Sequence, residues 1–216
     1  TDYESNIDQL ATAGYSPIFA VGFLMTDTVS KMSTAFPDTS FAGVDEFFDP
    51  VPANVVGLNF KEEEGSYLAG VVAGLATKAS FDSKLNSDNV IGFVGGMDIP
   101  LIQKFEAGFI AGAKSVNPDV KVISLYAGNF TDQAKGKELG YSLIEQKADV
   151  IYAAAGQVGL GTVQACKDKG ALFIGVDVDQ YETVKDSGSV MLTSMIKRVD
   201  NAVFETIKAA NDGAFP

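Results

Sequence analysis

The stretch Ala171-Leu-Phe-Ile-Gly-Val-Asp-Val-Asp-Gln180 begins with an apolar, partly β-branched run that follows Gly170 and stops at Asp177. A continuous apolar run of this length after a helical pattern predicts a buried parallel strand, because helices cover both faces of such a sheet. In open α/β sheets, ligands bind beyond the carboxyl ends of the strands. Asp177 is therefore a candidate ligand contact, and a loop-capping aspartate is the alternative.

Strands and helices alternate on both sides of this stretch. We predict further strands at residues 17–22, 40–45, 54–59, 90–96, 120–126, 148–155 and 190–194. We predict helices at about residues 7–14, 26–36, 61–78, 100–114, 131–146, 162–170 and 198–211. This alternation is typical of βαβ units with right-handed crossovers, and therefore of an α/β fold with parallel sheets.

A polar connection, residues 80–89, divides the pattern in two. We expect two doubly wound parallel-sheet lobes: residues 1–85 joined by 189–216, and residues 86–188. A ligand cleft between two such lobes is the default site. The first lobe has only two clear strands and one extended piece, so we expect a leading strand-helix unit and a C-terminal return to be missing from the chain as given.

Composition narrows the functional classes. The 28 Asp and Glu residues outnumber the 16 Lys and Arg residues, giving a net charge of −12, which disfavours nucleic acid and anionic membrane surfaces as partners. The chain has no His and one Cys, so the commonest general base and the usual metal ligands are absent. We therefore expect no enzyme, no metal ion and no cofactor, and we interpret Cys166 as a small buried side chain.

Glycines stand out at two places. Gly156-Gln-Val-Gly159-Leu-Gly161 lies between a predicted strand and a predicted helix, which is the setting of a dinucleotide-binding loop. A glycine-rich loop that approaches some other polar ligand explains it equally well. In the long helix, Gly65, Gly70 and Gly74 recur at near-helical spacing and predict close packing against a sheet or another helix.

Two more side chains belong to the predicted strand ends. Tyr152 lies in a strand that is about to reach its carboxyl end, where its ring could line a site or pack in the core. Lys197 follows the last strand, where it could contact a ligand or be a solvated lysine at a helix start. Glu62-Glu-Glu64 is best interpreted as a solvated helix start that favours anions, not as a metal cluster.

Several motifs follow one another in a fixed order along the chain. They are Asp2-Tyr-Glu-Ser-Asn6, Gly22-Phe-Leu-Met-Thr-Asp27, Phe60-x4-Gly65-Ser-Tyr-Leu-Ala-Gly70, Gly92-Phe-Val-Gly-Gly96, Phe105-Glu-Ala-Gly-Phe109, Gly175-Val-Asp177 and Thr193-Ser-Met-Ile-Lys-Arg-Val-Asp200. Together these motifs resemble a known family, the basic membrane protein lipoproteins of bacteria, which are purine nucleoside receptors similar to PnrA. The resemblance covers nearly the whole chain.

This resemblance implies a type I periplasmic-binding-like fold and an extracytoplasmic, noncatalytic protein that delivers a nucleoside to an ABC transporter permease. It also implies attachment to the cell membrane through an N-terminal lipid, although the lipid-bearing Cys is not in this chain. The family holds the base between two aromatics, of which one lies on the missing first segment. The implied ligand contacts are Tyr152 stacking on the base, Asp45 at the base edge, Asp177 and Lys197 on the ribose, and the loop residues Gly156 and Gln157.

One departure and two rival functions accompany the resemblance. Gln157 stands where the family usually has Gly, so it could narrow the pocket or add a hydrogen bond. A dinucleotide-dependent enzyme using Gly159-Leu-Gly161 is the first alternative. The sensor core of a transcription regulator is the second, although such a protein needs a basic helix-turn-helix that this acidic chain does not contain.

Overall fold

The structure, a computed structural model, describes residues 2–215 of the 216-residue chain. The chain forms two compact units. The first comprises residues up to Phe60 together with those from Arg198 onward, and the second comprises Lys61–Lys197. None of the helices in residues 2–215 combines the length and the hydropathy that are needed to span a bilayer.

The first unit contains a parallel sheet of three strands, in the order β1-β2-β3. A core of apolar side chains, including Ile7, Val29 and Phe41, joins the sheet to the helices at residues 3–12 and 26–35. The elements are α1 (Tyr3–Thr12), β1 (Ile18–Val21), the 3-10 turn η1 (Phe23–Met25), α2 (Thr26–Ala35), β2 (Phe41–Val44), β3 (Val55–Leu58) and α8 (Val199–Asn211).

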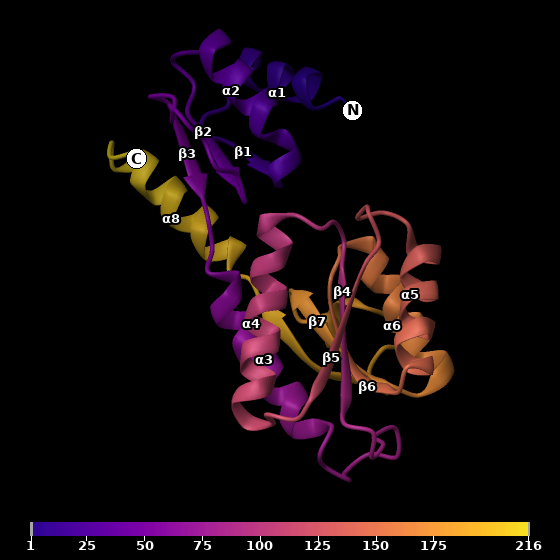
Figure 1. The fold of residues 1–216 in the computed structure, drawn as a ribbon. Helices are drawn as coiled ribbons and strands as arrows, with labels where there is room; N and C mark the ends of the chain where they lie inside the picture. Colours follow the sequence, from indigo (N-terminus) through magenta and orange to yellow (C-terminus); the bar gives the residue numbers. More distant parts are fainter. Residues whose placement is uncertain (1, 216) are drawn as a thin grey trace. The chain divides into compact units, whose positions relative to one another are not determined.

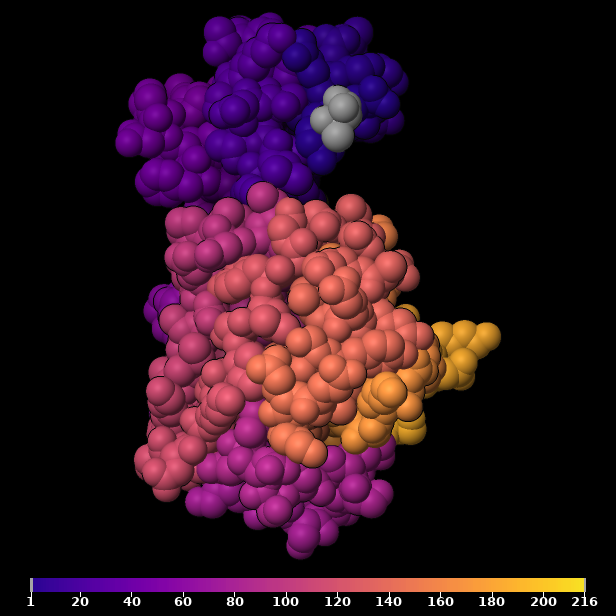
Figure 2. Space-filling model, turned by 45° about the vertical axis from the view of Figure 1, so that its right-hand side comes forward, coloured from indigo at the N-terminus to yellow at the C-terminus, as the bar shows by residue number. Residues whose placement is uncertain are grey.

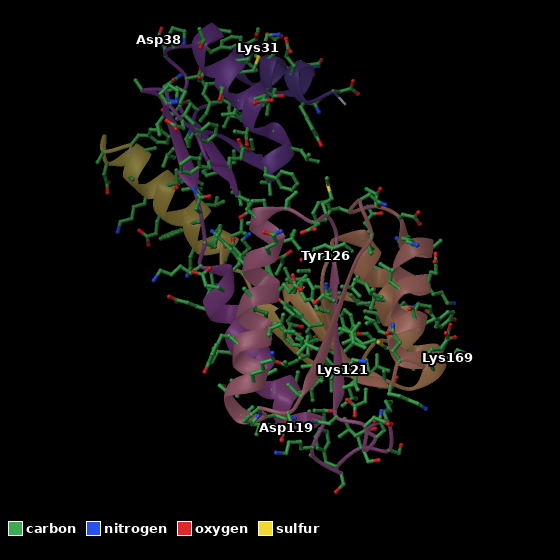
Figure 3. All side chains as sticks on the ribbon, in the orientation of Figure 1. Lys31, Asp38, Asp119, Lys121, Tyr126 and Lys169 are labelled. Carbon is green, nitrogen blue, oxygen red and sulfur yellow. The ribbon has the colours of Figure 1, made fainter. Side chains whose placement is uncertain are left out.

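The second unit contains a parallel sheet of five strands, in the order β5-β4-β6-β7-β8. Its strands are β4 (Val90–Gly95), β5 (Lys121–Tyr126), β6 (Ala148–Ala154), β7 (Leu172–Asp177) and β8 (Met191–Ile196). Its helices are α3 (Glu62–Ala76), α4 (Pro100–Val116), α5 (Gln133–Glu145), α6 (Gln157–Lys169) and the short α7 (Gln180–Thr183). Figure 3 labels Lys121 and Tyr126, the first and last residues of β5, which mark the direction of the strands.

Helices cover both faces of this second sheet. α3 and α4 lie on one side and α5 and α6 on the other (Figure 1). Along β7, Leu172 and Ile174 belong to the core under α3 and α4, whereas Phe173 belongs to the core under α5 and α6. The predicted burial of this apolar run on both faces is therefore confirmed. Figure 2 shows, in salmon to orange, the outer surface that residues of α5 and α6 contribute.

Glycines let the helices of each layer approach through their backbones. A Cβ on Gly70 of α3 would lie 2.0 Å from the carbonyl oxygen of Phe109 in α4, and one on Gly112 would lie 1.9 Å from that of Tyr67. A Cβ on Gly65 would meet Met195 of β8, and a Cβ on Gly74 would meet Ala113 of α4. The close packing predicted for Gly65, Gly70 and Gly74 is therefore confirmed.

The predicted loop at residues 156–161 is wrong. α6 begins at Gln157, so Gly159 and Gly161 lie inside a helix. A Cβ on Gly161 would lie 1.9 Å from the carbonyl oxygen of Gln133 in α5, which explains this glycine by helix packing. Cys166, on the same helix, is fully buried, as predicted.

The unit boundaries also differ from the prediction. The sequence pattern predicts that residues 61–85 and 189–197 belong to the first lobe, but the structure places them in the second unit. The physical reason is that β8 continues the second sheet beside β7, while α3 packs against α4. The polar connection, residues 80–89, therefore links α3 to β4 within one unit.

Candidate functional site

Asp177 lies at the carboxyl edge of the second sheet, as the sequence predicted. It is the last residue of β7, its side chain is exposed, and its φ of +67° places it in the left-handed region. Among residues with a side chain, Asp and Asn adopt this region most readily. The Asp177 carbonyl oxygen accepts a hydrogen bond from the Lys197 amide at 2.9 Å, which joins the ends of β7 and β8.

Lys197 is not a solvated lysine. Its side chain is only 5% exposed, and its Nζ lies 3.2 Å from Oε1 of Glu62. The same Nζ lies 5.7 Å from the centre of the Phe105 ring, within the range of a cation–π contact. The ammonium group is therefore held at the carboxyl edge of the sheet by a carboxylate on one side and an aromatic ring on another.

Glu62 is the residue of this edge that the sequence reasoning missed. Of the three consecutive acids that open α3, Glu63 and Glu64 are exposed, but the Glu62 side chain is 1% exposed. The interpretation of Glu62 as part of a solvated helix start is wrong. The signal was available in the spacing, because Glu62, Ser66, Ala69 and Ala73 follow one helical face, and that face is buried.

Tyr152 takes the alternative role, core packing. Its side chain is fully buried, and its ring centre lies 5.7 Å from that of Phe93 and 5.2 Å from that of Phe109. Its hydroxyl lies 3.0 Å from the Ser66 hydroxyl, and burial raises the pKa of the phenol. A ring enclosed by protein on all sides has no face for a base, so this placement does not support the predicted stacking role.

Gly156 and Gln157 lie where β6 passes into α6, and both are exposed. Gly156 has a φ of +55°, and a Cβ there would lie 3.0 Å from the carbonyl oxygen of Phe130. The same oxygen accepts a hydrogen bond from the Gln157 amide at 2.8 Å. These contacts fix the segment after β5 against the start of α6.

Phe130, which the sequence reasoning did not select, is an aromatic that reaches this edge without being enclosed in the core. Its side chain is half-buried, and its ring covers Gly96, where a Cβ would lie 2.2 Å from Cε1 of the ring. Gly96 follows β4, and Phe130 follows β5, so the ring lies beyond the carboxyl ends of these strands. The signal in the sequence was the aromatic between the strand at 120–126 and the Thr131-Asp132 helix start.

Asp45 belongs to the first unit. It follows β2, its side chain is half-buried, and its φ is +62°. Its amide donates a hydrogen bond to the carbonyl oxygen of Leu58 at 3.0 Å. The next residue, Glu46, is fully buried, and burial together with the negative charge of Asp45 raises the pKa of its carboxyl group to about 8.

A hollow of about 800 Å³ lies elsewhere, among residues 77–89 of the connection that precedes β4. It faces the amino ends of the strands, opposite to the edge that carries Asp177. Because ligands of open α/β sheets bind at the carboxyl ends, we place the candidate site at Asp177 and Lys197 and not in this hollow.

The chain is similar to proteins of one family over its whole length. The family described as "ABC transporter substrate-binding protein PnrA-like" matches residues 1–216. The chain is 38% identical to a CD4+ T-cell-stimulating antigen of Listeria monocytogenes, covering 100% of this chain and 61% of the relative. It is also 38% identical to the ABC transporter nucleoside-binding protein BmpA of Lactococcus lactis, covering 100% of this chain and 63% of that protein.

A solved structure supports the same assignment. A solute-binding protein of an ABC transporter system from Aeropyrum pernix is similar with a TM-score of 0.82 and 28% identity, over 99% of this chain and 60% of that one. The chain thus spans about three fifths of the length of these relatives. The fold is the predicted α/β arrangement of two parallel sheets, typical of periplasmic binding proteins, and the chain belongs to the PnrA-like substrate-binding proteins of ABC transporters.

Proposed function

We propose that the protein binds a purine nucleoside and delivers it to an ABC transporter. One observation carries the proposal: two charged groups lie at the same sheet edge. They are the exposed carboxylate of Asp177 and the buried ammonium of Lys197, which is ion-paired to Glu62. A carboxylate that accepts and an ammonium that donates suit the vicinal hydroxyls of a ribose, and charged partners give stronger hydrogen bonds than neutral ones. A nucleoside is also what the name of the Lactococcus lactis relative specifies for that protein.

The base needs an aromatic face, which we assign to Phe130 in place of Tyr152. Phe130 is half-buried beyond the ends of β4 and β5, whereas Tyr152 is enclosed. Stacking on an aromatic ring contributes about 1–3 kcal/mol per base and tolerates different bases. The exposed backbone at Gly156 and Gln157 would approach the ribose, and Asp45 of the first unit remains the predicted contact to the base edge.

The wider setting follows from the family. We propose a noncatalytic, extracytoplasmic protein whose partners are a small-molecule nucleoside and the permease of an ABC transporter, attached to the cell membrane through a lipid outside residues 1–216. The rival dinucleotide-dependent enzyme has less support, because Gly161 packs against α5 and Gly159 lies inside α6. The transcription regulator has less support, because the family that matches residues 1–216 is described as a substrate-binding protein of an ABC transporter.

The experiment is isothermal calorimetry of the full-length protein with adenosine, guanosine and inosine, with free ribose and NAD as comparison ligands. We expect binding heat from at least one purine nucleoside and weaker or no heat from ribose, because ribose lacks the base that stacks. Heat from NAD alone would support the enzyme, and no heat from any nucleoside would contradict the proposal.

A further inference from the structure

Glu62 and Lys197 form an ion pair that is almost removed from solvent. The exposed fractions of their side chains are 1% and 5%, and Oε1 of Glu62 lies 3.2 Å from Nζ of Lys197. Burying an ion pair takes two charges out of water, and such pairs are often no more stabilising than apolar side chains of similar volume. Stability alone therefore does not account for a carboxylate in this position.

The second oxygen of the same carboxylate is held much more loosely. Oε2 of Glu62 lies 3.6 Å from Nζ of Lys104, beyond hydrogen-bond distance, and the Lys104 side chain is 49% exposed. The N-terminal turn of α3, which Glu62 opens, adds a favourable dipole for the negative charge. The helix start thus favours the negative charge of Glu62, and Lys197 is the closer of the two lysine partners of the carboxylate.

The pair also lies where the chain passes between its two units. The second unit begins at Lys61 and ends at Lys197, so the chain crosses from unit to unit at residues 60/61 and 197/198. Glu62 is the second residue after the first crossing, and Lys197 is the last residue before the other. The ion pair thus connects the start of α3 with the end of β8, two segments that are 135 residues apart in the sequence and adjacent to the two crossings.

We propose that Glu62 is the positioning residue of the site: its carboxylate holds the Lys197 ammonium at the carboxyl edge of the sheet and links the two crossing segments. The proposal rests on the proposed role of Lys197 as a ligand contact. Glu62 itself needs no contact with the ligand, since it acts through Lys197. Loss of its charge would remove the buried carboxylate partner of the ammonium and loosen the hold on Lys197 at this edge.

The test compares Glu62→Gln with Glu63→Gln in the full-length protein. The neighbouring Glu63 opens the same helix turn but is exposed, so its variant makes the same chemical change outside the ion pair. The ligand-free readouts are the NMR signal of the Lys197 Nζ group and the rate at which an amine-acylating reagent modifies Lys197, measured by peptide mass spectrometry. Lys84, whose side chain is 24% exposed, serves as the reference for general opening of the structure.

We expect Glu62→Gln to shift or broaden the Lys197 signal and to raise its acylation rate several-fold relative to Lys84, while Glu63→Gln changes neither. If Glu62→Gln folds poorly, Glu62→Asp, which keeps a carboxylate, should restore both readouts in part. A Lys197 that stays equally protected in folded Glu62→Gln would overturn the proposal.

Calorimetry then separates this proposal from the proposed function. We expect Glu62→Gln to bind nucleoside at least about tenfold more weakly than the wild type, because the lysine loses its orienting charge. Wild-type affinity in that variant would overturn the positioning role. If the wild type itself binds no nucleoside, the proposed function fails, and the ligand-free readouts still decide whether Glu62 holds Lys197.

Discussion

Glu46 is a carboxyl group enclosed in the first unit, and it makes that unit sensitive to pH. Its pKa is raised from the ordinary 4.5 to about 8, first by burial and then by the charge of Asp45. Between these two values the folded chain holds a proton that the unfolded chain has released. Stability should therefore fall as pH rises from about 4.5 to 8, by at most about 1.4 kcal/mol per pH unit.

Glu46→Gln should remove this dependence, because an amide does not titrate. We expect urea unfolding at pH 5, 6, 7 and 8 to show that the variant gains stability over the wild type as pH rises, whereas the exposed-site variant Glu63→Gln follows the wild type. Parallel curves for Glu46→Gln and the wild type would show that the carboxyl group is not protonated in the folded state.

Asp177 can be tested against an aspartate of the same backbone conformation. Asp186 is also exposed, with a φ of +57°, and Asn tolerates this region as well as Asp does. We expect Asp177→Asn to weaken nucleoside binding about tenfold or more in calorimetry, since a hydrogen bond to a charged group contributes about 1.5–3 kcal/mol. Asp186→Asn should keep full affinity, and both variants should melt within about 2 °C of the wild type.

A large loss of melting temperature in Asp177→Asn, without a specific loss of affinity, would instead assign Asp177 the loop-capping role.

The two aromatics at the second sheet separate core packing from ligand stacking. Phe130→Leu keeps an apolar side chain over Gly96 but removes the ring, so nucleoside binding should weaken by about 1–3 kcal/mol. Tyr152→Phe keeps the enclosed ring and loses only the contact with Ser66, so it should lower stability by about 1 kcal/mol and leave affinity unchanged. The reverse pattern in paired calorimetry and denaturation would restore the original assignment of Tyr152.

At the scale of elements, glycine contacts set how closely the helices pack. Gly70→Ala places a Cβ 2.0 Å from a carbonyl oxygen of α4, so α3 and α4 must move apart. We expect a loss of about 1–3 kcal/mol in the free energy of unfolding. Gly159→Ala is the matched control in another helix, since its Cβ would meet only Ala153 at an ordinary 3.6 Å and should stabilise α6 by up to about 1 kcal/mol.

Equal effects of the two alanine substitutions on denaturant unfolding would contradict the assignment of Gly70 to interhelical contact.

The elements themselves were largely predictable, because each apolar run and each helical pattern is local in sequence. The eight predicted strands and seven longer helices are all present, with the start of α6 as the main error. That error arose because a glycine inside a helix and a glycine in a loop look alike until a neighbour is known. Gly161 is explained only by Gln133, which lies in another helix.

At the scale of the whole molecule, the two-unit organisation was predicted but its boundaries were not. The sequences of α3 and β8 carry no local sign of the unit to which they belong. An amphipathic helix could cover either sheet, and an apolar strand could extend either one. The residues of the candidate site likewise divide into those that the sequence predicted and those that it did not. Asp177 was predictable from the end of an apolar run, and the helical spacing marks Glu62 as buried. The enclosure of Tyr152 and the pairing of Glu62 with Lys197 depend instead on which helix covers which strand.

The most direct test of the central claim is a crystal structure of the full-length protein with guanosine or inosine bound. It should place the ribose hydroxyls within hydrogen-bond distance of the Asp177 carboxylate and the Lys197 ammonium, with Glu62 still paired to Lys197. A nucleoside bound elsewhere, with Asp177 and Lys197 making no contact to its sugar, would contradict the account.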